Sequence, residues 1–81
     1  MIISKFLGFV ITTYQDIDKP YIVINYQDEA LSVYDFRMME WVKDGGLSDI
    51  CKEALIEWIE DVRDDLISMF RQNEYHFIPE V

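Results

Sequence analysis

The sequence predicts an α+β domain in which a three-stranded antiparallel sheet is packed by one long C-terminal helix, with a short helix before it as an open option. Three observations support this class. Segments rich in β-branched and aromatic residues fill the N-terminal half, Asp44-Gly45-Gly46 interrupts the chain, and a helical apolar period follows. The 81 residues amount to a single domain, 1–81, and their 51% apolar content is enough for a core without staples.

Three segments before the glycine pair are predicted as strands. Residues 6–14 form the first, because β-branched and aromatic side chains dominate them. The polar connection 15–20 ends in a proline that begins the next strand at 21–26. A turn at 27–29 leads to the third strand at 30–36, which alternates in part between polar and apolar residues. Together the three strands predict an antiparallel meander.

Residues 37–43 fit two structures. They either prolong the third strand or form a short helix, for which Asp35 would be the N-cap and Gly45 the C′ residue.

A long helix is predicted from Asp49 to about Gln72. Ser48 is a suitable N-cap, and Asp49 in the first turn interacts favourably with the helix dipole. The tail at 74–79 alternates weakly and is expected to be extended and to dock on the body. Apolar residues recur along the helix at spacings of three and four, namely Cys51, Leu55, Trp58, Val62, Leu66 and Met69. The predicted core packs Leu55, Trp58, Val62 and Leu66 against Phe9, Val10, Ile22 and Ile24.

The charge of the chain is strongly negative. Sixteen acids oppose seven bases, so the net charge is −9. Such a surface repels nucleic acid and anionic membranes and attracts basic proteins. Tyrosines on or beside the strands could stack on bases only next to a basic groove, which the sequence lacks. We therefore expect neither direct nucleic-acid binding nor membrane binding; the alternative reading is that the acidity only confers solubility.

Seven of the acids fall between Asp49 and Asp65, where only Lys52 and Arg63 oppose them. On a helix, acids at every fourth position repeat every ~6 Å, which is within a factor of two of the ~3.4 Å rise between phosphates of one nucleic-acid strand. Four like-charge i,i+4 pairs together cost ~1–2 kcal/mol, which a basic partner would offset. The alternative is a solvated face whose repulsion is screened by salt. The predicted partner-binding residues are Glu53, Glu57, Glu60, Asp61, Asp64 and Asp65.

No catalytic or metal-binding residues are predicted. The carboxylate pairs in 64–65 and 16–18 lack the spacing of a calcium loop and have no His or Cys cluster nearby. Cys51 lies on the apolar stripe of the helix, where a core role is expected, and His76 lies in the tail. We therefore expect no enzyme activity, no metal and no cofactor.

The cellular location is predicted to be the cytoplasm. The apolar run near the N-terminus is about nine residues long, too short to span a bilayer, and lacks a cleavage site. A single cysteine cannot form an internal disulfide, which fits a reducing compartment.

In size, acidity and order of elements, the chain resembles the small proteins with which phages block host defences or host DNA enzymes. That group includes anti-CRISPR proteins, anti-restriction proteins and inhibitors of uracil-DNA glycosylase. The resemblance covers the whole chain in general character and includes no motif, so no functional residues are carried over. It implies a protein that acts in the host cytoplasm and presents carboxylates where a nucleic-acid backbone would lie.

Two functions are therefore expected. The first is an acidic inhibitor that binds a basic nucleic-acid-binding protein, a nuclease or a protein–nucleic acid complex and blocks its nucleic-acid site by charge mimicry. The alternative is a non-enzymatic structural or regulatory interaction module that associates through apolar surface, for example as a homodimer. Salt separates the two, because only charge-driven binding weakens steeply as the salt concentration rises.

Overall fold

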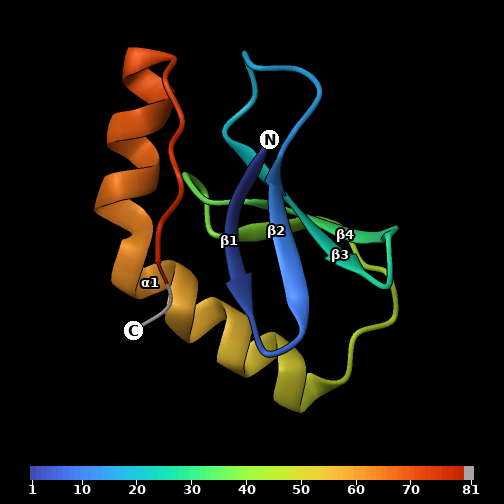
Figure 1. Cartoon of the computed structure of the whole chain (residues 1–81). Helices are drawn as coiled ribbons and strands as arrows, with labels where there is room; N and C mark the ends of the chain where they lie inside the picture. The colour runs from blue at the N-terminus through green and yellow to red at the C-terminus, as the bar shows by residue number, and fades with distance from the viewer. Residues whose placement is uncertain (80–81) are drawn as a thin grey trace.

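The computed structural model describes residues 1–79 as a five-stranded antiparallel sheet and one helix (Figure 1). Each strand pairs with its neighbour in sequence, so the sheet order is β1-β2-β3-β4-β5. The α+β class is confirmed, whereas the predicted three-stranded sheet is wrong. The elements are β1 (Ile2–Phe6), β2 (Phe9–Thr13), β3 (Tyr21–Tyr26), β4 (Glu29–Asp35), β5 (Glu40–Lys43) and α1 (Asp49–Gln72).

The first additional strand comes from a turn within the predicted strand 6–14. Leu7 and Gly8 have φ angles of 50° and 80°, and Phe6 pairs with Phe9 across them. Two successive residues at positive φ are typical of a type I′ hairpin, which joins β1 to β2. The sequence signal is weak because the first turn position holds leucine instead of the usual Asn, Asp or Gly.

The second additional strand lies in the segment 37–43, which forms neither a continuation of β4 nor a short helix. The Asp35 carboxylate accepts hydrogen bonds from the N–H groups of Arg37 and Met38, both at 2.9 Å. This is the bonding of a helix cap, but Met39 has a φ of 57° and turns the chain back instead. β5 then pairs with β4, and the Trp41 ring meets Tyr34 edge-on at 4.8 Å.

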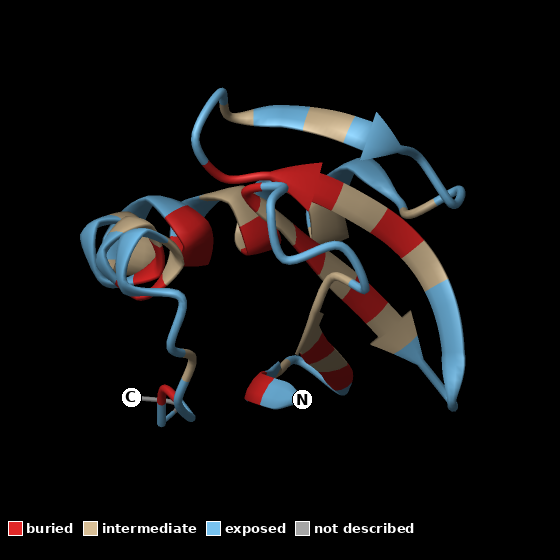
Figure 2. Ribbon diagram, turned by 90° about the horizontal axis from the view of Figure 1, so that it is seen from above, coloured by how far each residue is buried: buried red, intermediate tan, exposed pale blue. Residues whose placement is uncertain are grey.

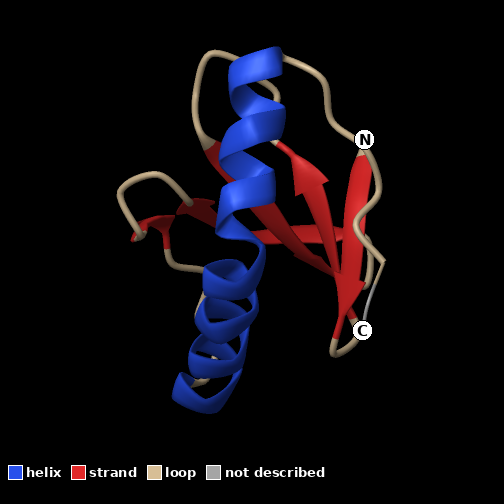
Figure 3. Cartoon of the chain, turned by 90° about the vertical axis from the view of Figure 1, so that its left-hand side faces the viewer, coloured by secondary structure: helices blue, strands red, loops and turns tan. Residues whose placement is uncertain are grey.

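The long helix begins and ends as predicted. The Ser48 hydroxyl accepts a hydrogen bond from the Cys51 N–H at 3.2 Å, and Asn73 closes the helix in the left-handed conformation. α1 contains no proline or glycine, yet its two halves lie at an angle to one another (Figures 1 and 3). Within residues 1–79, no helix is both long enough and apolar enough to cross a membrane.

The core lies between α1 and the curved sheet (Figure 2). The buried face of α1 differs slightly from the predicted stripe. Ile59, beside Trp58, is fully buried, whereas Val62, which the predicted stripe includes, is only half-buried. In β2, side chains alternate between the two faces, so Val10 is half-buried on the opposite face from its neighbours. The predicted core is confirmed for the other six positions: Phe9, Ile22, Ile24, Leu55, Trp58 and Leu66.

The chain after α1 returns along the helix to β1 (Figure 1). The Ile78 N–H donates to the Ile3 carbonyl at 2.6 Å, and the buried Ser4 hydroxyl donates to the Ile78 carbonyl at 2.8 Å. Ile78 is itself buried in the core. The expected docking of this tail is therefore confirmed, and it places Ile78 and Pro79 beside the helix.

Candidate partner-binding surface

The six predicted binding residues all stand on α1 and are all exposed. None of them forms an ion pair with a base among residues 1–79, where the observed ion pair joins Lys52 to Asp44. Within the described part of the chain, none of their charges is neutralised by a direct ion pair. We call them the helix carboxylates: Glu53, Glu57, Glu60, Asp61, Asp64 and Asp65.

The helix carboxylates do not all lie on one face of α1. Residues four apart on a helix are rotated by ~40°, so a row of fourth positions winds slowly around the axis. Glu57, Asp61 and Asp65 line one groove, while Asp64 lines a cavity elsewhere on the helix. Glu60 lines neither hollow but lies near Tyr34: burial raises the pKa of the Tyr34 phenol, and the Glu60 carboxylate raises that pKa further. Three of the six residues are thus brought together.

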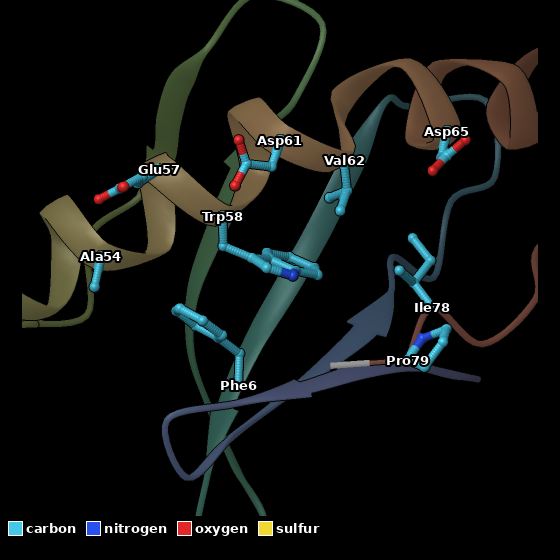
Figure 4. Close-up of a pocket in the computed structure, with 9 residues that line it drawn as sticks. All are labelled: Phe6, Ala54, Glu57, Trp58, Asp61, Val62, Asp65, Ile78 and Pro79. Carbon is cyan, nitrogen blue, oxygen red and sulfur yellow. The ribbon is translucent and has the colours of Figure 1, made fainter. Parts of the chain in front are cut away.

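The groove lies between α1, β1 and the tail, and we call it the α1–β1 groove (Figure 4). It encloses about 550 Å³. The Phe6 ring from β1 stacks on the Trp58 ring from α1, with centroids 5.8 Å apart and planes at 23°. Its walls are mostly apolar, and the lining residues are Phe6, Ala54, Glu57, Trp58, Asp61, Val62, Asp65, Ile78 and Pro79.

The two rims of this groove differ in charge. Glu57, Asp61 and Asp65 lie along the helix side, whereas the lining residues of the opposite wall within residues 1–79 are the uncharged Phe6, Ile78 and Pro79 (Figure 4). The arrangement can receive apolar side chains between the walls and cationic groups along one edge. Sequence reasoning found the acidic rim but missed the opposite wall, because β1 and the tail come from the two ends of the chain.

A second cavity, of about 460 Å³, gathers three of the seven basic residues beside Asp64: Arg37, Arg63 and Arg71. The Arg63 guanidinium donates from Nε to the Phe36 carbonyl at 3.0 Å and from Nη2 to the Arg37 carbonyl at 2.8 Å. These two hydrogen bonds of Arg63 connect α1 to the turn between β4 and β5. These guanidinium groups offset the charge of Asp64, so the uncompensated negative charge lies mainly with the other helix carboxylates.

The residues considered for other chemistry are separate from this surface. Cys51 is half-buried against the core, and His76 is exposed in the tail. Within residues 1–79, no group of three or more His, Cys, Asp or Glu side chains is arranged to hold a metal ion. Trp41 and Met39 are half-buried, whereas Met38 is 60% exposed.

Comparisons with protein families, characterised proteins and solved structures found no match for this chain. Its function is therefore inferred from the geometry and charge of the chain itself.

Proposed function

We propose that this protein is an acidic inhibitor that binds a basic nucleic-acid-binding protein or nuclease and blocks its nucleic-acid site. The helix carboxylates would occupy positions that phosphates otherwise take. The observation that carries the proposal is that all six are exposed and without ion-pair partners among residues 1–79, on a chain of net charge −9.

Electrostatics supports such a partner in three ways. Carboxylates and phosphates both accept charge-assisted hydrogen bonds from arginine and lysine, so a site built for one can hold the other. Repulsion between the helix carboxylates is relieved when a partner's cations lie between them, so part of its ~1–2 kcal/mol favours the complex. The net charge also steers a basic partner toward the surface at long range.

Charge reversal at the groove rim tests the proposal. Glu57→Lys with Asp61→Lys converts two repulsive i,i+4 pairs into attractive ones, although the two new lysines repel each other. Circular dichroism should therefore show an intact fold. Immobilised protein should retain nucleic-acid-binding proteins from a lysate at low salt, and the reversed variant should retain much less of them. Equal retention by the folded variant would contradict charge mimicry.

A second candidate function is self-association through apolar surface, and the outer edge of β5 favours it. β5 is an edge strand, and Val42 on it is 49% exposed. Met38 in the preceding turn is also exposed. Sedimentation measured at low and high salt distinguishes the two functions. A homodimer that persists at high salt would support self-association, and a monomer at all concentrations would exclude it.

A further inference from the structure

We infer that the α1–β1 groove receives a cationic amphipathic helix of the partner. This inference rests on the proposed function and names the element that the acidic surface binds. The partner helix would place apolar side chains between α1 and the tail, and lysine or arginine residues along the rim formed by Glu57, Asp61 and Asp65.

The walls of the groove require apolar contacts. Phe6 is only half-buried despite its stacking on Trp58, and Val62 is also half-buried. Covering this surface would contribute ~25 cal/mol for each Å² removed from water. A dry apolar cavity of ~150 Å³ holds a benzene molecule, so about 550 Å³ has room for more than one side chain. The volume is also within the usual range for ligand sites.

The charge distribution requires a cationic occupant. The three rim carboxylates are four residues apart and therefore ~6 Å apart along the axis. Basic residues at every fourth position of a helix lying beside α1 have the same spacing. Because the wall formed by Phe6, Ile78 and Pro79 is uncharged, the bases are needed on one flank only. Spacing alone would also suit an extended strand, whose side chains on one face recur at a similar distance.

The hydrogen bonding of β1 favours a helix over a strand. An added strand binds through backbone groups of a free sheet edge. Here the tail already bonds to the edge of β1, because the Ile78 N–H donates to the Ile3 carbonyl and so takes one of the backbone groups that an added strand would use. A helix satisfies its own backbone groups and binds a groove through side chains at i, i+3, i+4 and i+7. The groove therefore matches the requirements of an amphipathic helix.

A designed peptide provides the probe. It is ~18 residues long, about five helical turns, with leucines on one face and lysines along one flank. A peptide of the same composition in scrambled order is the control. In a Trp41→Phe background, Trp58 is the remaining tryptophan and lies in the groove. The amphipathic peptide should change the emission of Trp58, whose ring lines the groove, and gain helical circular dichroism, whereas the scrambled peptide should do neither. Equal binding of both peptides, or binding of neither, would overturn the inference.

Two matched pairs of variants locate the site. Glu57→Lys with Asp61→Lys should weaken peptide binding about tenfold, equivalent to ~1.4 kcal/mol. Glu53→Lys with Glu60→Lys makes the same change in net charge on the same helix, but outside the groove. We expect this control pair to weaken binding no more than about threefold, since its lysines act on the cationic peptide through longer-range repulsion only.

Filling the groove tests the apolar contacts. Ala54→Trp places a large side chain among the lining residues, and Ser68→Trp places it on an exposed position of α1 outside the groove. The first should weaken peptide binding about tenfold, and the second should leave it unchanged.

The outcomes separate this inference from the proposed function. If both charge pairs weaken binding equally and Ala54→Trp has no effect, attraction is diffuse, so the groove inference fails and charge mimicry stands. If the groove variants behave as expected but nucleic acid does not compete with the protein for its partner, the groove is a docking site and the proposed inhibition fails.

Discussion

Truncation of Trp58 is the perturbation whose cost follows most directly from the packing. The side chain is 9% exposed, stacks on Phe6 and forms part of the groove wall. A buried aromatic residue removes ~200 Å² from water, which corresponds to ~5 kcal/mol at ~25 cal/mol per Å². The extended-chain reference overstates this burial by ~10–40%. Because the space left by truncation opens into the groove, no closed cavity adds to the cost.

Trp58→Ala should therefore lower the free energy of unfolding by ~3–4 kcal/mol, near the lower end of the usual range for aromatic truncation. With a urea m-value of ~1 kcal/mol/M for a small domain, the unfolding midpoint should fall by ~3 M. Ile50→Ala is the control, because Ile50 is 80% exposed on the same helix and its truncation should cost less than ~0.5 kcal/mol.

A double-mutant cycle isolates the stacking contribution. Trp58→Ala and Phe6→Ala should show a coupling energy of ~0.5–1.5 kcal/mol, the usual value for an aromatic pair. If Trp58→Ala costs less than ~1 kcal/mol, the side chain is not packed in the core. The assigned face of α1, and with it the groove, would then be wrong.

Three further predictions concern the backbone, pH and metals. Gly45→Ala should lower the unfolding free energy by more than ~2 kcal/mol in urea titration, because its Cβ would clash with the backbone carbonyl of Leu31. Gly46→Ala, at φ 82° with open space around it, should cost only ~1 kcal/mol. Burial, reinforced by nearby carboxylates, raises the pKa of Tyr34 above 10.0, so the folded state favours the neutral phenol. The stability that this raised pKa contributes is complete below pH 10 and should be lost as pH rises through the folded pKa. Tyr34→Phe should flatten this alkaline loss in pH-dependent denaturation. Calorimetric titration with Ca²⁺, Mg²⁺ and Zn²⁺ should reveal no stoichiometric micromolar site, and such a site would show that the carboxylates act as ligands.

The features predictable from the sequence are those that depend on local chemistry. The helix, its Ser48 cap and the outward direction of its acids follow from residues within a few turns of one another. β3 was placed correctly, because Pro20 and the turn at 27–29 bound it, and the same turn placed the start of β4 to within one residue. In these segments, side-chain periodicity and capping specify the same structure that the tertiary fold adopts.

The features that were missed depend on tertiary context. Leu7 adopts a positive φ for which its side chain gives no warning, so one predicted strand became two. The Asp35 side chain bonds two successive N–H groups, as it would at the start of a helix, but the chain turns back at Met39. The groove could not be derived at all, because Phe6 and Ile78 meet only in the folded chain.

The central claim, that the helix carboxylates compete with nucleic acid for a basic protein, is tested most directly by a competition titration. The apparent Kd of the chain for a nucleic-acid-binding partner captured from lysate would be measured against increasing concentrations of that partner's DNA or RNA, at low and at high salt. We expect the apparent Kd to rise in proportion to the nucleic acid concentration and binding to weaken steeply with salt. An apparent Kd that is independent of both would contradict it.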